Sequence, residues 1–191
     1  NGLTNLSHPC QVMADVLTLE EHKGPLDRQT VSWVGDGNNV AASWIHAVGV
    51  MGGKLTLGCP EPLNPTPEVM AWAKKVGAKV NLTTSPEQAV KDADCVITDC
   101  WVSMHDKDGE SRHNLLKPYQ VNSAAMEKCG NPKVKFLHCL PAFHDRQTEI
   151  GEAVYRKFGI DSMEVTDEVF ESPASIVFDQ AENRLHTIKA V

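Results

Sequence analysis

Short apolar runs alternate with amphipathic stretches along most of the chain. Five runs are typical of strands: TVSWVG (30–35), KLTLGC (54–59), AKVNLTT (78–84), DCVITDC (94–100) and KVKFLHCL (133–140). Helical patterns separate them at about residues 40–51, 68–76 and 119–129, and Ser85 with Pro86 begins a short helix. The alternation predicts an α/β fold with a doubly wound, mostly parallel, Rossmann-like sheet flanked by helices.

The first 25 residues depart from this alternation. They predict a loop followed by an amphipathic helix, with Ser7 as the N-cap and Pro9 in the first turn. One apolar face of that helix would consist of Val12, Met13, Val16 and Leu17. A helix of this kind usually connects two units, so we expect residues 1–25 to be an interdomain segment and the chain to lack an N-terminal domain.

The remaining boundaries follow from the end of the strand pattern. We expect the α/β domain to span residues 26–177 and the start of a closing C-terminal helix to occupy 178–191. Within the domain, an amphipathic helix is predicted at about 148–158, and the segment VTDEVFESPAS (165–175) is predicted to be irregular.

Composition limits the classes of partner. The chain has 191 residues with ordinary globular hydrophobicity, which is enough for a core without disulfides or metals. A net charge of −7 argues against nucleic-acid or membrane-surface partners, although a local cationic pocket for an anionic substrate is compatible with it. The six cysteines show neither CxxC pairs nor zinc spacing, so we expect free thiols in a reducing cytoplasm. No apolar run reaches the roughly 18 residues of a membrane span.

Polar side chains follow three of the predicted strands, where open parallel sheets bind their ligands. The first strand is followed by Asp36, Asn38 and Asn39, the fourth by Asp99, Trp101, Ser103 and Met104, and the fifth by His138, Cys139 and Leu140. Asn and Asp together suit the ammonium and carboxylate of an amino acid. Each has an ordinary alternative, because Asx residues after strands often cap a helix and a single cysteine is most often a buried apolar residue. The turn GDGNN lacks the GxGxxG pattern, so a nicotinamide cofactor has little support.

Several segments resemble the ornithine carbamoyltransferase family. They are HPCQ (8–11), DCWVSM (99–104) and HCLPAFHD (138–145), with NGLT, GDGNN, TDEVFES and FDQAENR in support, so the resemblance runs nearly from end to end. It implies transfer of a carbamoyl group from carbamoyl phosphate to the δ-amine of L-ornithine, giving citrulline and phosphate. It also implies a homotrimer of two-domain subunits that uses neither a metal nor an organic cofactor.

The resemblance also implies residue roles. His8, Gln11 and Arg184 would contact carbamoyl phosphate, and Cys139 and Leu140 would lie between the two substrates. The ornithine-binding residues would be Asn39, Asp99, Ser103 and Met104. Cys139 and Asp99 are the candidate catalytic pair, because attack requires a neutral amine and this pair is placed to accept or relay its proton.

Two departures from the family pattern qualify this prediction. His105 stands after Met104 where the family usually has glycine, and the phosphate-binding segment Ser-x-Arg-Thr-Arg does not occur in the 191 residues. We therefore expect the isolated chain to have negligible carbamoyltransferase activity. Two alternatives stay open: a related carbamoyltransferase with another amine acceptor, and a fold-retaining amino-acid-binding or regulatory module without catalysis.

Overall fold

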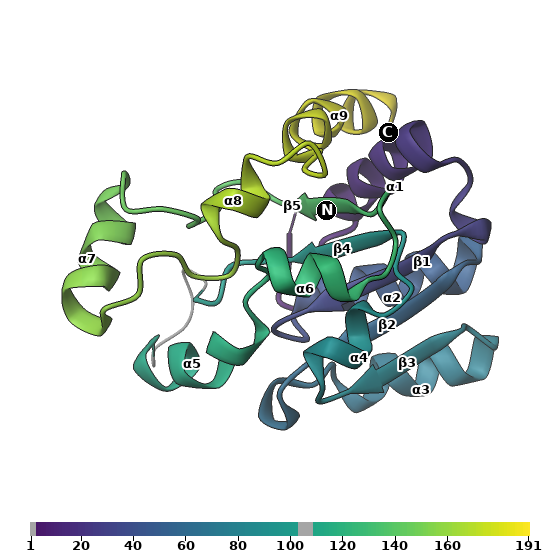
Figure 1. Ribbon diagram of the computed structural model, residues 1–191. Helices are drawn as coiled ribbons and strands as arrows, with labels where there is room; N and C mark the ends of the chain where they lie inside the picture. The colour runs from purple at the N-terminus through teal and green to yellow at the C-terminus, as the bar shows by residue number, and fades with distance from the viewer. Residues whose placement is uncertain (1–2, 103–108) are drawn as a thin grey trace.

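A five-stranded sheet forms the centre of the computed structural model, which describes residues 3–102 and 109–191, with the backbone alone at 109–110. The strands are β1 (Thr30–Val34), β2 (Lys54–Gly58), β3 (Val80–Thr83), β4 (Cys95–Thr98) and β5 (Lys135–His138). Their order is β3-β2-β1-β4-β5, and every neighbouring pair is parallel (Figure 1). The predicted doubly wound sheet is confirmed.

The chain reverses its direction of travel across the sheet between β1 and β4. It runs outward from β1 to β2 and β3, then returns to place β4 on the other side of β1 and β5 beyond it. Side chains of β4 are buried along the whole strand, and those of the edge strand β3 are not. In sheets of this topology, ligands bind at the carboxyl ends of the strands beside this switch point.

Helices cover both faces of the sheet. The α-helices are α1 (Pro9–Lys23), α2 (Asn39–Met51), α3 (Pro67–Val76), α4 (Pro86–Val90), α5 (Gly109–Leu116), α6 (Ser123–Lys128), α7 (Glu149–Phe158), α8 (Asp167–Phe170) and α9 (Val177–Ala190). Short 3₁₀ turns occupy Leu26–Arg28, Glu61–Leu63 and Lys117–Tyr119. One core cluster joins α1, α2 and α3 to the sheet, and a second joins α4, α6 and α8 to its other face.

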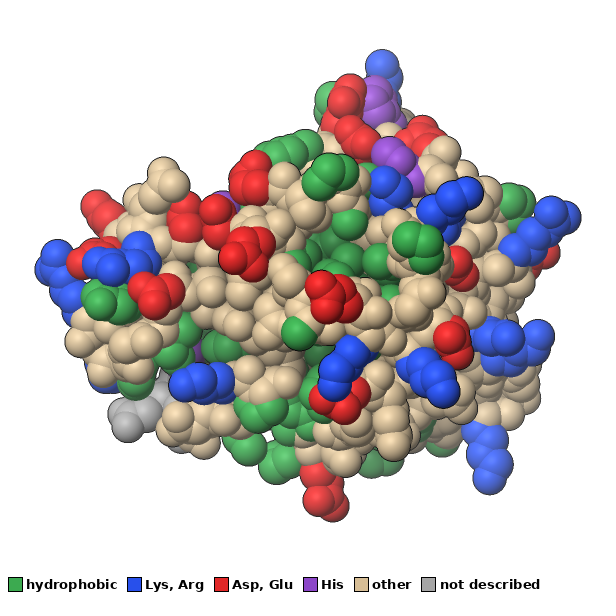
Figure 2. All heavy atoms as spheres, in the orientation of Figure 1, with side chains coloured by type: hydrophobic (Ala, Val, Ile, Leu, Met, Phe, Trp, Pro, Cys, Tyr) green, Lys and Arg blue, Asp and Glu red, His purple; other side chains and the backbone are tan. Residues whose placement is uncertain are grey.

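Two further features lie near the carboxyl ends of the strands or join the ends of the fold. The helix α9 packs along α1, so that the first and last helices of the chain lie side by side (Figure 1). A third apolar cluster, around Trp101, Leu116 and Met163, lies beyond the carboxyl ends of β4 and β5, where α5 and α7 are found. Charged side chains of both signs are interspersed over the face of the molecule seen in Figure 2.

The structure corrects several boundaries. The N-cap of α1 is His8 rather than Ser7, and Met13 is 42% exposed instead of lying on the buried face. That face includes the polar residues Gln11 and Asp15, which an apolar pattern does not detect.

The predicted helix at 119–129 begins later, at Ser123, because Asn122 caps it and Val121 pairs with Val165. The helix α8 lies in the segment predicted to be irregular, and α5 lies after β4 in residues for which no helix was predicted. The helix predicted at about 148–158 is present as α7, and Thr148 caps it, its hydroxyl accepting the Gly151 N–H at 3.0 Å.

All six cysteines are free thiols, as predicted. None of the helices in residues 3–102 and 109–191 combines the length and apolar character needed to cross a bilayer.

Candidate active site

The loop after β1 contributes Asn38, a strand-end residue for which no ligand role was predicted. Its Oδ1 accepts the backbone N–H groups of Val40 and Ala41, at 2.9 and 3.1 Å, and so caps α2. Its Nδ2 donates to Asp99 Oδ2 at 2.8 Å. The amide thus performs the ordinary capping role and also holds a carboxylate from the neighbouring strand. Asn39, which was predicted to bind ornithine, instead donates to the Thr4 carbonyl at 2.7 Å.

Asp99, just after β4, receives hydrogen bonds from three segments of the chain. Its Oδ1 accepts the Cys139 thiol at 3.0 Å and the Cys100 N–H at 2.8 Å, while Oδ2 accepts Asn38. Thr98 and His138 are register partners in β4 and β5, so the residues that follow them lie next to each other. We call Asn38, Asp99 and Cys139 the strand-end group.

The Cys139 thiol is a hydrogen-bond donor in this group. Burial and the negative charge of Asp99 raise its pKa well above the ordinary value for cysteine. The side chain is therefore a protonated thiol at neutral pH rather than a thiolate. Of the catalytic pair predicted from the sequence, Asp99 is the member with acceptor oxygens.

The buried pair of His138 and Glu164 lies next to Cys139. His138 Nε2 lies 3.2 Å from Glu164 Oε1, with both side chains fully buried, and that oxygen also accepts the Phe143 N–H at 2.7 Å. The other ring nitrogen, His138 Nδ1, contacts the Cys139 carbonyl. Burial lowers the pKa of His138, but Glu164 and Asp99 outweigh it and the net pKa is raised. These contacts hold the turn that begins at Cys139. Within that turn, the peptide bond between Leu140 and Pro141 is cis.

The second part of the site lies between α1 and α9. Arg184 Nη1 donates to Gln11 Oε1 at 2.9 Å, and the His8 N–H donates to Ser43 Oγ at 2.7 Å. Burial, together with the positive charge of Arg184, lowers the pKa of His8, so its ring is neutral at pH 7. We call His8, Gln11 and Arg184 the helix-pair group. His8 interacts electrostatically with both Arg184 and Asp99, which links the two groups.

Donor atoms with metal-ligand chemistry also gather here. The sets Asp99–His138–Cys139 and Cys100–His138–Glu164 each have ligand atoms within 4.8 Å of one another. The ring nitrogens of His138 already face Glu164 and the Cys139 carbonyl. Burial is the largest of the effects that raise the pKa of the Cys100 and Cys139 thiols, which disfavours the thiolate that would bind a metal. We therefore assign no metal to these sets.

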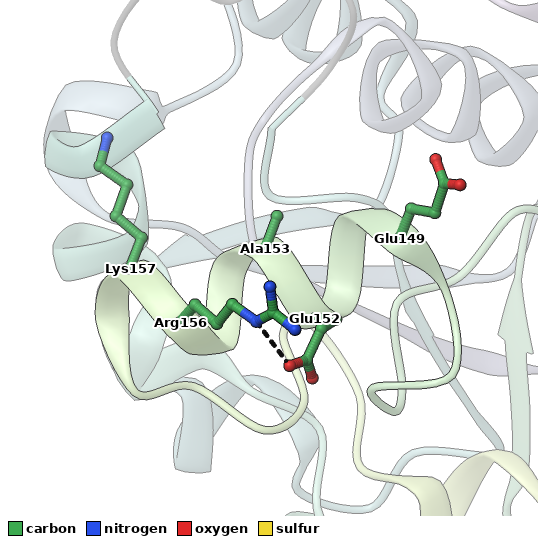
Figure 3. A pocket seen from close by; sticks show the side chains of 5 residues that line it. All are labelled: Glu149, Glu152, Ala153, Arg156 and Lys157. Atoms are coloured by element: carbon green, nitrogen blue, oxygen red, sulfur yellow. Dashed lines mark hydrogen bonds and ion pairs between the residues drawn. The ribbon is translucent and has the colours of Figure 1, made fainter.

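A surface hollow on α7 lies away from the strand ends. It has a volume of about 610 Å³ and is lined by Glu149, Glu152, Ala153, Arg156 and Lys157 of α7 (Figure 3). All five residues belong to one helix, and Arg156 Nε donates to Glu152 Oε1 at 2.8 Å. Because these charges neutralise each other in water, we place the chemistry at the strand ends instead.

Residues 27–191 match the family described as aspartate/ornithine carbamoyltransferase, Asp/Orn binding domain. The chain belongs to this family. It is 52% identical over 191 residues to an ornithine carbamoyltransferase of Rhodopseudomonas palustris, covering 100% of this chain and 55% of that one. It is 52% identical over 193 residues to a catabolic ornithine carbamoyltransferase of Bacillus cereus, covering 100% of this chain and 58% of the relative. The chain thus spans about half the length of the curated relatives it matches.

Solved structures agree with the family and the fold. The ornithine carbamoyltransferase of Pyrococcus furiosus has a TM-score of 0.84 and 40% identity, with 100% of this chain and 56% of that one covered. The enzyme of Thermus thermophilus gives a TM-score of 0.79 and 36% identity, with 100% and 56% covered.

The predicted site residues of this carbamoyltransferase-family chain fall into four sets. Asp99 and Cys139 are in direct contact, and His8, Gln11 and Arg184 form the second group. Leu140, 42% exposed, follows Cys139 directly, and Asn39 contacts the N-terminal segment instead of Asp99. Ser103 and Met104, together with His105, lie outside the described residues.

Besides Asn38, three buried polar residues that hold the site together were not predicted from the sequence. They are Asp15, Glu164 and Gln180, all nearly or fully buried. Gln180 donates to Asp15 Oδ1 at 2.6 Å and accepts the His138 N–H at 3.0 Å. No sequence pattern marks these residues, because their partners are distant along the chain; the one local signal is the i,i+4 spacing of Gln11 and Asp15.

Proposed function

We propose that this chain is the ornithine-binding part of an ornithine carbamoyltransferase. The enzyme transfers a carbamoyl group from carbamoyl phosphate to the δ-amine of L-ornithine, giving citrulline and phosphate. The observation that carries the proposal is the contact between Asp99 and Cys139 at the carboxyl ends of β4 and β5, beside the switch point of the sheet and near the helix-pair group. The names of the curated relatives and of the solved structures support the same reaction.

Asp99 has the chemistry to receive the amine. An ionised carboxylate has about four acceptor positions, and three of those on Asp99 are used by Cys139, Cys100 and Asn38. The remaining position is on Oδ2, where it can accept an N–H of the substrate amine. An alkyl ammonium has a pKa of about 10, so a proton must leave before the nitrogen attacks the carbamoyl carbon. Asp99 accepts that proton, and the Cys139 thiol fixes the direction of the carboxylate.

The helix-pair group has the chemistry to hold the carbamoyl end. Attack on the carbamoyl carbon places negative charge on its oxygen, and the Arg184 guanidinium is a cation that stabilises such charge. His8, being neutral, donates from one ring nitrogen, and its Nδ1 is buried without a hydrogen-bond partner among the described residues. Gln11 contacts the carbamoyl group beside it. Leu140 and Cys139 lie between the two substrates, and Asn39, Ser103 and Met104 bind ornithine with Asp99.

The proposal includes the organisation of the whole enzyme. Residues 1–25 connect domains, 26–177 form the ornithine domain and 178–191 begin the closing helix. A second domain supplies the cationic segment that holds the phosphate, and the enzyme is a cytoplasmic homotrimer without a metal, an organic cofactor, or a nucleic-acid or membrane partner. Alignment of two bound substrates supplies much of the acceleration, worth up to about 7–11 kcal/mol in favourable cases.

The test compares two proteins in a citrulline-forming assay. One is the 191-residue chain, and the other is a fusion of this chain with the part of the Rhodopseudomonas palustris relative that lies outside the matched region. We expect activity with L-ornithine and carbamoyl phosphate in the fusion and negligible activity in the chain alone.

Further amine acceptors, namely L-lysine, putrescine, L-aspartate and N-acetyl-L-ornithine, show which substrate is used. A folded fusion that carbamoylates none of these amines would support the non-catalytic module instead. Preference for an amine other than ornithine would support a related carbamoyltransferase.

A further inference from the structure

Asp15 is a buried carboxylate that no step of the proposed reaction uses. It lies on α1 and is 1% exposed. Its Oδ1 accepts Gln11 Nε2 at 2.8 Å and Gln180 Nε2 at 2.6 Å, and its Oδ2 accepts Trp44 Nε1 at 3.1 Å. Burying a charge is costly unless hydrogen bonds compensate it, and here side chains from α1, α2 and α9 supply them. Three helices therefore converge on one acceptor.

The position of Asp15 determines how the Gln11 amide is turned. The oxygen and nitrogen of a glutamine amide exchange places on rotation, so the neighbours decide which atom faces which side. An ionised Asp15 only accepts hydrogen bonds, and Arg184 on the other side only donates them. Both neighbours require Nε2 toward Asp15 and Oε1 toward Arg184, as observed at 2.8 and 2.9 Å. Gln11 thus offers an acceptor, not a donor, on the side of Arg184.

We propose that Asp15 is a positioning residue that determines specificity, because it holds Gln11 so that the site selects an acyl phosphate bearing NH₂ over one bearing CH₃. This inference rests on the proposed function, in which Gln11 contacts the carbamoyl group. Carbamoyl phosphate and acetyl phosphate differ by this one group. The carbamoyl NH₂ donates to the acceptor position of Gln11 Oε1 that Arg184 leaves open, whereas a methyl group leaves that position unfilled. A site built to bind an N–H rejects the analogue that lacks it.

A carboxylate performs this task better than an amide. An asparagine at position 15 offers both a donor and an acceptor, so position 15 no longer selects one orientation of the Gln11 amide, and Arg184 alone opposes its reversal. In the reversed orientation, two NH₂ groups face each other, and the preference for the carbamoyl group is lost.

The same carboxylate orients Gln180, whose Oε1 accepts the His138 N–H at 3.0 Å. Trp44 Nε1 donates to Asp15 Oδ2, whereas the amides of Gln11 and Gln180 both donate to Oδ1. A change at Trp44 therefore removes a hydrogen bond to Asp15 without touching either amide, and Trp44 is the matched control.

The experiment measures discrimination in the fusion protein and in its variants Asp15→Asn and Trp44→Phe. Carbamoyl phosphate is the substrate and acetyl phosphate the competing inhibitor. The quantity is the ratio of the Ki for acetyl phosphate to the KM for carbamoyl phosphate. We expect Asp15→Asn to lower this ratio about tenfold, the size expected for the loss of one buried hydrogen bond to the carbamoyl NH₂, and Trp44→Phe to leave it unchanged. An unchanged ratio in Asp15→Asn, or an equal fall in Trp44→Phe, would overturn the proposal.

A second measurement needs no activity. Hydrogen exchange of the Gln11 side-chain amide, followed by NMR on the 191-residue chain, is expected to be slow in the parent and in Trp44→Phe, and fast in Asp15→Asn. Fast exchange in the parent overturns the orientation by itself, even if Asp15→Asn does not fold. Absence of citrulline formation by the parent fusion counts against the proposed function, whereas the exchange rate still decides whether Asp15 holds Gln11.

Discussion

The strand-end group and the helix-pair group hold their polar atoms by different means. Asp99 and Cys139 are neighbours because β4 and β5 are neighbours, and the backbone of a parallel sheet fixes their spacing. Gln11 and Arg184 come from helices at opposite ends of the chain, and a buried carboxylate orients the amide between them. The backbone therefore secures the first group, and buried side-chain chemistry secures the second. Substitutions should separate the two: changes at the strand ends alter chemistry, while changes between the helices alter orientation and stability.

The largest effect is expected from Asp99→Asn. The substitution keeps the shape of the side chain but removes the acceptor for the amine proton, and a positioned general base contributes up to about 10⁴-fold. We expect kcat/KM of the fusion protein to fall about 10⁴-fold with little change in thermal stability. The control is Cys100→Ser, because Asp99 contacts the backbone N–H of Cys100 and not its thiol. Comparable losses in both variants would mean that the strand-end backbone, not the carboxylate, is what matters.

The pair beneath the strand ends should affect stability instead. Glu164→Leu leaves the buried His138 without its carboxylate and the Phe143 N–H without its acceptor. Removing one partner of a buried pair costs about 4 kcal/mol, which urea unfolding of the 191-residue chain would measure. Glu152→Gln, in an exposed pair on α7, should change the unfolding free energy little. A loss below about 1 kcal/mol in Glu164→Leu would indicate that the strand-end turn does not depend on this pair.

Asp15 should give the helix pair a pH dependence of stability. Burial raises the pKa of Asp15 to about 6 from 3.8, and the groups that interact with it electrostatically include Asp99, Cys95 and Cys139. The folded state therefore binds a proton more tightly than the unfolded state, and stability falls as the pH rises from about 4 to 6. At about 1.4 kcal/mol per pKa unit, the loss is about 3 kcal/mol at pH 7.

The measurement is the unfolding free energy of the parent minus that of Asp15→Asn, followed across this pH range. Position 15 does not titrate in the variant, so the difference isolates the carboxylate. A flat difference, or one that rises with pH, would contradict the raised pKa.

The contrast between the groups also explains what the sequence could predict. Apolar runs were enough to predict five strands in a doubly wound sheet, and the strand order found in the structure brings Asp99 and Cys139 together. The capping role of Asn38 could have been predicted, since an Asn before an apolar helix is a capping signal, but the ligand-binding role was predicted for Asn39. Asp15 and Gln180 are 165 residues apart, and their contact exists only because α9 packs on α1. A buried polar residue in an amphipathic pattern looks like a solvated one, so tertiary packing alone identifies its role.

The smallest effect is expected from substitutions that separate the two roles of Asn38, which caps α2 and donates to Asp99. Asn38→Ser keeps a side-chain oxygen for capping α2 and removes the amide that donates to Asp99 Oδ2, whereas Asn38→Ala removes both. We expect each variant to lower kcat/KM about tenfold, because one hydrogen bond to a charged group contributes about 1.5 kcal/mol. Only Asn38→Ala should also lose about 1 kcal/mol of stability, the usual contribution of an N-cap, as measured by urea unfolding. If Asn38→Ser retains full activity, Cys139 and the backbone of Cys100 are sufficient to orient Asp99, and the strand-end group depends on its backbone alone.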